Sequence, residues 1–267
     1  MPEGDTIFRA ATSLRTWMGG RVVSAARSKR PIGIDRLIGR HIERVEANGK
    51  HLLMHFVHPD AEHALVLQTH MRMTGSWHVY EVGAAWKRPK HQATLVVEAG
   101  ERVAIGFNIP IVSLDTEHWM RSTPALRSLG SDILSASFDL NDVLRRLATQ
   151  PADRALGEVL LDQTIVAGIG NIYRCESLFA CRHNPWAPLG SLTEAQRRNL
   201  IGSAQSLMQA NVGTDVGRDF GRGRSVANVY RRTRRPCRVC STPIESALQG
   251  IQARRVYWCS VCQSQVA

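Results

Sequence analysis

The chain has 267 residues, enough for two modest domains with a sizeable core, and its apolar content of 43% is ordinary for a soluble globular protein. A net charge of +11 argues against an acidic partner and favours a polyanion; because no long basic amphipathic helix accompanies the charge, nucleic acid is favoured over a membrane surface. The sequence shows neither a long apolar run nor a secretory signal, so we expect a cytoplasmic protein, associated with the nucleoid in a prokaryote.

The first predicted element is a helix over residues 4–18, whose apolar residues share one face and which Gly19-Gly20 ends. Short runs rich in β-branched residues follow, separated by turn signals such as Asn48-Gly49. They cover residues 21–26, 41–47, 51–56, 64–69, 76–80, 93–98, 102–106 and 109–114. This pattern predicts an N-terminal eight-stranded β-sandwich with a flanking helix, over residues 1–125.

Helical periodicity replaces the strand pattern in the second half of the chain. The predicted helices cover residues 139–148, 155–162, 172–182 and 192–209, the last opened by a capping box of Ser191 and Glu194. A connector rich in glycine and arginine follows at residues 213–223. We therefore predict an α+β multidomain protein, with a helical domain and its linker over residues 126–225 and a small hairpin domain over residues 226–267.

The C-terminal hairpin carries two C-x2-C pairs, Cys237 and Cys240 in CRVC and Cys259 and Cys262 in CSVC. This spacing is typical of one tetrahedral zinc ion held between two tight turns. The alternatives are four reduced thiols or two disulfides, and a reducing cytosol disfavours the disulfides. Four cysteine ligands leave no open coordination position, so the sequence predicts one structural Zn²⁺ and no catalytic metal.

The N-terminus offers a nucleophile. Removal of Met1 would expose the secondary amine of Pro2 at the positive end of the first helix, where the helix dipole disfavours protonation. Glu3 beside it could act as a general acid. The alternative is ordinary, because proline followed by an acidic residue is also a common helix start.

Four segments in register across the whole chain carry a family resemblance. They are the opening MPEGDT, Lys50 in ANGKHLL, the stretch LLDQTIVAGIGNIYRCE and the terminal CRVC with RRVYWCSVCQ. Together they resemble the formamidopyrimidine-DNA glycosylase and endonuclease VIII family, and Gly4 after Glu3 is closer to the endonuclease VIII branch. The resemblance implies a bifunctional DNA glycosylase and abasic-site lyase of base excision repair, with a helix-two-turn-helix domain and a zinc-finger hairpin.

The resemblance also implies catalytic roles for three N-terminal residues. Pro2 would attack the sugar of the damaged nucleotide and form a Schiff base, which permits β,δ-elimination, and Glu3 would protonate the sugar ring oxygen as it opens. Lys50, after the Asn48-Gly49 turn, would bind a phosphate or donate a proton. A solvated turn lysine is the alternative for Lys50.

Two residues of the second half match the family's phosphate contacts. Asn171 follows Gly168-Ile169-Gly170, whose glycines allow backbone N–H groups to approach a phosphate at the next helix; capping of that helix is its alternative role. Arg254, five residues before Cys259, matches the zinc-hairpin arginine that binds the lesion phosphates and assists δ-elimination. Arg255 is the less favoured substitute.

The stretch from His70 to Gly75 resembles the family's wedge loop. Met73 would fill the gap left by the rotated nucleotide and Arg72 would reach the opposite strand, although a methionine after a strand is often a core residue. Oxidised-purine enzymes usually carry an Arg-Phe pair after the eighth strand, but here Gly106-Phe107-Asn108 is followed by no arginine until Arg121. Oxidised pyrimidines are therefore the favoured substrates.

The leading hypothesis is a monomeric enzyme acting on damaged DNA, with no small-molecule cofactor and no membrane association. One rival is a non-enzymatic zinc-ribbon protein that binds nucleic acid through charge alone. Another is a family member that has kept lesion binding and lost base excision.

Overall fold

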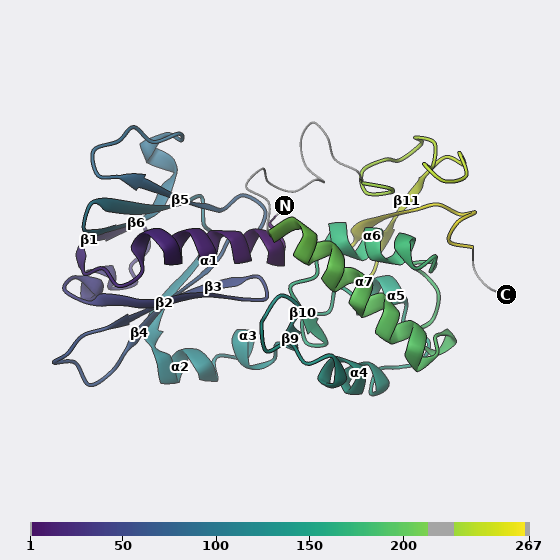
Figure 1. The fold of residues 1–267 in the computed structure, drawn as a ribbon, viewed down its shortest axis with the longest axis horizontal. Helices are drawn as coiled ribbons and strands as arrows, with labels where there is room; N and C mark the ends of the chain where they lie inside the picture. The colour runs from purple at the N-terminus through teal and green to yellow at the C-terminus, as the bar shows by residue number, and fades with distance from the viewer. Residues whose placement is uncertain (1, 213–226, 265–267) are drawn as a thin grey trace. The chain divides into compact units, whose positions relative to one another are not determined.

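The computed structural model describes residues 2–212 and 227–264, so the predicted connector at residues 213–223 lies outside the described residues. The chain divides into two compact units, Met1–Ser128 and Leu129–Ala267, called here the N-terminal unit and the C-terminal unit (Figure 1). The finer division into three domains stays a prediction. In the parts of the chain that are described, no helix is both long and apolar enough to cross a membrane.

The N-terminal unit is a β-sandwich of two four-stranded antiparallel sheets, which confirms the predicted fold. One sheet has the order β1-β6-β7-β5 and the other β2-β3-β4-β8. The strands are β1 (Val23–Ser28), β2 (His41–Asn48), β3 (His51–Val57), β4 (Leu65–His70), β5 (Ser76–Glu81), β6 (Ala93–Ala99), β7 (Arg102–Phe107) and β8 (Ile111–Thr116). Short 3-10 turns lie at η1 (Ile34–Leu37) and η2 (Lys90–Gln92).

Helix α1 (Gly4–Met18) packs against β2 and β3 and also contacts β5 and β7. Its buried face repeats every three or four residues through Ile7, Ala11, Leu14 and Met18, each 0–1% exposed. These side chains join the apolar core between the sheets, so the position of the first turn of α1 is fixed by packing. Helices α2 (Glu117–Ser122) and α3 (Pro124–Arg127) close the unit.

The C-terminal unit is mainly helical. Its helices are α4 (Leu140–Ala148), α5 (Leu156–Val159), α6 (Asn171–Ala180) and α7 (Glu194–Val212), with a 3-10 turn at η3 (Leu189–Ser191). Two short parallel strands, β9 (Ser131–Asp132) and β10 (Val166–Ala167), brace the loop before α6. The antiparallel hairpin of β11 (Glu245–Gln249) and β12 (Arg254–Trp258) packs against α6 through an apolar cluster that includes Ile172 and Val256.

The predicted capping box of Ser191 and Glu194 is wrong. Helix α7 starts two residues later than predicted, and the reciprocal bonds join Thr193 and Gln196. The Thr193 N–H donates to Gln196 Oε1 over 2.8 Å, and the Gln196 N–H donates to Thr193 Oγ1 over 3.3 Å. Ser191 instead belongs to the preceding turn, where its hydroxyl donates to the Pro188 carbonyl. Both pairs satisfy the same sequence pattern, and only the start of the helix distinguishes them.

Candidate active site and nucleic-acid interface

The N-terminus of α1 holds the first two candidate residues. Glu3 is the N-cap, with an extended backbone, and its carbonyl accepts the N–H groups of Thr6 (2.9 Å) and Ile7 (3.2 Å). Its side chain is fully buried, while Pro2 before it is half-buried. A buried carboxyl group next to a half-buried proline can place an acid and, once Met1 is removed, a nucleophilic amine at one point.

Lys50 lies in the turn that joins β2 and β3. Asn48 pairs with His51 across this hairpin, and Gly49 has a φ of 59°, a left-handed conformation that suits glycine. The Lys50 side chain is half-buried. Figure 1 shows the start of α1 and the β2–β3 turn at the same end of the sandwich. The N-terminal unit therefore gathers Pro2, Glu3 and Lys50 at one end.

A histidine pair stands beside Lys50. His51 on β3 and His70 on β4 are cross-strand neighbours, with ring centroids 4.9 Å apart. Burial is the main cause that lowers the pKa of His51 to about 4, and repulsion from a protonated His70 is the second. Burial also lowers the pKa of His70 to about 4, with the positive charge of Arg72 as the second cause. Both rings are neutral near pH 7. Since His70 Nδ1 accepts the Arg72 N–H over 3.0 Å, its Nε2 carries the proton and can donate to an acceptor at this end of the sandwich.

The two methionines of the predicted wedge loop differ in exposure. Met71 is 1% exposed and belongs to the core, whereas Met73 is 57% exposed. Arg72 between them is exposed and has a φ of 49°, which turns the chain outward. The loop closes where the Gly75 N–H donates to the Met71 carbonyl over 2.8 Å. Met73 is thus presented at the surface.

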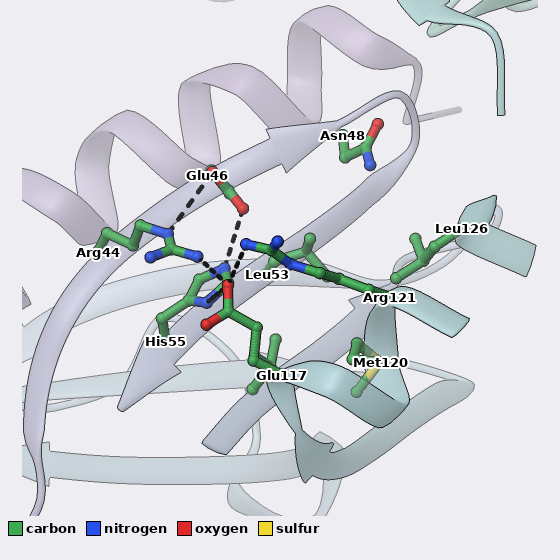
Figure 2. Close-up of a pocket in the computed structure, with 10 residues that line it drawn as sticks. Arg44, Glu46, Asn48, Leu53, His55, Glu117, Met120, Arg121 and Leu126 are labelled. Atoms are coloured by element: carbon green, nitrogen blue, oxygen red, sulfur yellow. Dashed lines mark hydrogen bonds and ion pairs between the residues drawn. The ribbon is translucent and has the colours of Figure 1, made fainter. Parts of the chain in front are cut away.

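A separate cavity of about 220 Å³ opens on the outer face of the β2-β3-β4-β8 sheet (Figure 2). Arg44 and Arg121 donate to the same oxygen of Glu117, over 2.5 and 2.7 Å. His55 Nε2 lies 2.9 Å from Glu46 Oε1, and His55 Nδ1 lies 3.8 Å from Glu117 Oε1. Because two arginines face two glutamates, the cluster is nearly balanced in charge and joins α2 to the sheet.

The loop before α6 in the C-terminal unit is shaped by Gly168 and Gln163. Gly168 has a φ of 103°, a conformation that glycine adopts readily. The Gln163 amide braces the turn, since Oε1 accepts the Gly168 N–H over 3.1 Å and Nε2 donates to the Ile169 carbonyl over 3.0 Å. Gly170 is the N-cap of α6 and Asn171 its first residue, so Asn171 does not cap the helix. Its half-exposed side chain stands at a helix N-terminus, where anions are favoured.

Arg254 and Arg255 begin β12 and point to opposite faces of the hairpin, because successive residues of a strand alternate. Arg254 pairs with Gln249 and lines a cavity of about 190 Å³ together with Arg154 and Arg174. Arg255 is exposed on the other face. The acidic side chains of Glu158 and Asp162 also line this cavity, and Asp162 is ion-paired with Arg154 over 2.8 Å. Arg254 therefore lines a concave surface of mixed charge, and Arg255 does not line it.

The four cysteines at the hairpin meet the geometry of one metal ion. Their sulfur atoms all lie within 4.8 Å of one another, with Cys237 and Cys262 at 3.9 Å and Cys240 and Cys259 at 3.4 Å. Sulfur atoms about 2.3 Å from a tetrahedral Zn²⁺ would be about 3.8 Å apart, whereas a disulfide requires about 2 Å. Hydrogen bonds from Thr242, first from its side chain, lower the pKa of the Cys240 thiol to about 6. The cluster can hold a metal, with one thiolate already favoured.

Comparison with known proteins gives the family. The model of the formamidopyrimidine-DNA glycosylase N-terminal domain matches residues 1–108, and that of the formamidopyrimidine-DNA glycosylase H2TH domain matches residues 129–219. A protein of Streptomyces coelicolor named "Probable endonuclease 8 2" is 38% identical, over 99% of this chain and 94% of its own length. This chain belongs to the formamidopyrimidine-DNA glycosylase family.

Other members of the family show its breadth. The protein of Mycolicibacterium smegmatis named "DNA-(apurinic or apyrimidinic site) lyase Nei2" is 32% identical, over 99% of both chains. A "Formamidopyrimidine-DNA glycosylase" of Moorella thermoacetica is 36% identical, over 92% of this chain and 93% of its own. Among solved structures, Lactococcus lactis Fpg in complex with DNA containing an abasic site gives a TM-score of 0.82 at 20% identity, covering 99% of this chain and all of that one. The last likeness confirms the fold.

Sequence analysis missed the buried charges of α6. Arg174 and Glu176 are 0% and 1% exposed within a helix whose other buried residues are mostly apolar. The Glu176 carboxylate accepts the N–H groups of Val229 and Tyr230 (3.0 and 2.8 Å) and of Asn228 (2.9 Å), which fixes the chain ahead of the hairpin. The only signal in the sequence was a pair of charged residues inside an apolar helical pattern, and buried charges are rare unless they have partners.

Proposed function

We propose that this protein is a bifunctional DNA glycosylase and abasic-site lyase, which removes oxidised bases from DNA in base excision repair. The observation that carries the proposal is the start of α1, where a half-buried Pro2 precedes a fully buried Glu3 at the end of the sandwich that also holds the Lys50 turn. The names of its relatives, endonuclease 8, formamidopyrimidine-DNA glycosylase and abasic-site lyase, support the same class of reaction.

Base excision would begin with Pro2. After removal of Met1, its amine attacks the anomeric carbon of the damaged nucleotide, and the glycosidic electron pair leaves with the base, which takes up a proton. Glu3 protonates the ring oxygen as the bond from that oxygen to the anomeric carbon breaks. The product is an iminium ion between Pro2 and the opened sugar. The position of Glu3 supports this role, because its fully buried side chain comes directly after Pro2 at the start of α1.

Strand cleavage would follow from the same adduct. The iminium acidifies the neighbouring sugar proton, and loss of that proton expels the 3′ phosphate; a second elimination expels the 5′ phosphate. Water then hydrolyses the iminium and releases the Pro2 amine. Lys50 holds a phosphate or donates a proton during β-elimination, and Arg254 steadies the phosphates and assists δ-elimination.

DNA binding would use both units. In the C-terminal unit, Asn171 holds a lesion phosphate at a helix N-terminus, and Arg254 holds another at the rim of the cavity that it lines. In the N-terminal unit, Met73 fills the gap left by the rotated nucleotide, and Arg72 reaches the opposite strand. The exposure of Met73, beside a buried Met71, supports this assignment.

Oxidised pyrimidines are the proposed substrates. Phe107 is fully buried at the end of β7, where it packs with Val96, Val103 and Ile105, so it is not available to stack against an estranged base. The segment from Phe107 to the start of β8 carries no arginine. This segment therefore lacks an arginine that could recognise the cytosine opposite an oxidised purine.

A single structural Zn²⁺, held by the four cysteines, would stabilise the hairpin that carries Arg254. Because all four ligands are cysteines, the ion supplies folding energy and takes no part in the chemistry. We propose that the enzyme acts as a monomer, without a small-molecule cofactor, in the cytoplasm.

Borohydride trapping on a duplex with one abasic site tests the proposal. The wild type is expected to give a covalent adduct and cleaved strands, and the Pro2→Gly variant to lose the adduct. Lys87→Ala, which removes an exposed primary amine of the same unit, is the matched control and should trap as the wild type does. An undiminished Pro2→Gly adduct would place the nucleophile elsewhere.

Two rival functions give different results in the same experiment. A non-enzymatic zinc-ribbon binder would show tight, salt-sensitive binding without adduct or cleavage. A family member without base excision would cleave the abasic duplex and leave a lesion duplex intact under single-turnover conditions. A panel of duplexes with defined lesions would then rank oxidised pyrimidines against oxidised purines.

A further inference from the structure

Arg174 is a buried side chain that contacts a candidate DNA ligand. It lies on α6, is 0% exposed, and donates through Nη2 to Asn171 Oδ1 over 2.5 Å. Its other amino group donates to Gln249 Oε1 (3.3 Å) and to the Gly157 carbonyl (3.4 Å). Because the acceptors of these hydrogen bonds lie on three different elements, the guanidinium has little freedom to move away from Asn171.

The bonds around Asn171 fix the orientation of its amide. Its Nδ2 donates to the Arg255 carbonyl over 2.8 Å, while its Oδ1 accepts from Arg174. A guanidinium can only donate and a backbone carbonyl can only accept, so the two ends of the amide cannot be exchanged here. One N–H of Nδ2 is used by Arg255, and the second is left for another acceptor.

This orientation matters because a phosphate oxygen is an acceptor. Asn171 is the first residue of a ten-residue helix, whose N-terminus favours an anion. With Oδ1 directed at Arg174, the half-exposed amide meets that anion through N–H. If the amide turned by half a rotation, Oδ1 would face the phosphate, and two acceptors would repel each other.

We propose that Arg174 is a positioning residue for DNA binding, which holds the Asn171 side chain with an N–H directed at the lesion phosphate. The inference rests on the proposed phosphate contact of Asn171 and assigns the residue that makes this contact possible. Arg174 also donates to the Arg254 carbonyl over 3.4 Å, so the same guanidinium joins α6 to the strand that carries the second phosphate ligand.

A double-mutant cycle on DNA binding tests the proposal. The ligand is a duplex with a tetrahydrofuran abasic analogue, which cannot undergo elimination, and its Kd is measured between about 50 and 200 mM salt. The variants are Arg174→Met, Asn171→Ala and the double substitution. Arg145→Met is the control, because Arg145 is an exposed, ion-paired arginine of the same unit. Zinc content and the melting temperature report whether each variant is folded.

Each single variant is expected to weaken binding by about tenfold, the effect of one hydrogen bond to a charged group, and to leave the salt slope nearly unchanged, because the contact is made by a neutral amide. The double variant should bind no more weakly than Asn171→Ala alone, because Arg174 acts through Asn171. On a cleavable abasic duplex, Arg174→Met should raise KM and leave kcat nearly unchanged, since the contact is present before and during the reaction. A merely structural role would lower kcat as well.

Other outcomes would overturn the inference. If Arg174→Met weakens binding as much in the Asn171→Ala background as in the wild type, Arg174 does not act through Asn171. Full affinity in Arg174→Met, with Asn171→Ala impaired, also rejects it. If Asn171→Ala itself binds normally, it is the proposed phosphate contact that fails. If Arg174→Met does not fold, Arg174→Lys replaces it in the double-mutant cycle. Lysine keeps the buried charge but cannot donate to Asn171 Oδ1 and Gln249 Oε1 at the same time in the geometry of a guanidinium.

Discussion

Substitution of Gly157 by alanine provides a test of the packing beneath the hairpin. Gly157 lies in α5, and a Cβ there would contact the Gln249 side chain, at 3.0 Å from its Cδ and 3.2 Å from its Nε2. Gln249 cannot move aside freely, because it is 6% exposed and bonded on two sides. Its Nε2 donates to the Pro185 carbonyl over 2.8 Å, and its Oε1 accepts from Arg174.

The magnitude follows from opposing effects. Alanine in place of glycine stabilises a helix by up to about 1 kcal/mol. Displacing Gln249 costs two buried hydrogen bonds, each about 1 kcal/mol, and overpacking adds about 1 kcal/mol or more. Gly157→Ala should therefore destabilise the C-terminal unit by about 2 kcal/mol, which lowers its melting temperature by roughly 8 °C.

Gly202→Ala is the matched control, because Gly202 lies within α7 and a Cβ there would meet no atom within 4 Å. It should raise the free energy of unfolding by about 0.5–1 kcal/mol. Scanning calorimetry of both variants measures the difference. Adding Gln249→Ala to Gly157→Ala should remove the overpacking part of the penalty. A Gly157→Ala protein as stable as Gly202→Ala would refute the described packing of Gln249.

Three further predictions concern the wedge, the outer cavity and the metal. Met73→Ala should slow base excision by about tenfold without loss of stability, which single-turnover rates measure. Met71→Ala should destabilise the N-terminal unit by about 2–5 kcal/mol, which thermal melts measure. The hydrogen bond from His55 lowers the pKa of Glu46, so its stabilisation is complete above the usual carboxyl range and is lost as pH falls through the lowered pKa. Glu46→Gln should cost at most about 1 kcal/mol near pH 7, since the side chain is 44% exposed, and almost nothing in acid. Equal losses at both pH values in urea titrations would contradict the stabilising hydrogen bond to the Glu46 carboxylate. Removal of the metal by a chelator should unfold the hairpin and abolish strand cleavage, while the β-sandwich keeps its circular dichroism signal. Full activity in metal-free protein would disprove the role of Arg254.

Much of the fold could be predicted because the patterns that carry it are local. Alternating and helical periodicity placed the eight strands and the longer helices within a few residues, and the cysteine spacing defined the hairpin. The capping box was misplaced because two overlapping pairs satisfy the same pattern. Choosing between them requires the start of the helix, which packing decides.

The candidate site was predictable only where a motif was contiguous. Met71 and Met73 are equivalent in sequence, and the backbone turn at Arg72 makes one a core residue and the other a surface residue. Likewise, only the register of the hairpin decides that Arg254 lies on one face and Arg255 on the other. Arg174 could not be assigned from the sequence, because the side chain of its partner Gln249 comes from 75 residues away.

The central claim is that the imino group of Pro2 becomes bonded to deoxyribose. Its most direct test is mass spectrometry of the borohydride-trapped protein after digestion, with the modified residue located by fragmentation. We expect Met1 to be absent and the sugar remnant to be on the nitrogen of Pro2. A remnant on a lysine side chain, or an active protein that still begins with Met1, would contradict the mechanism.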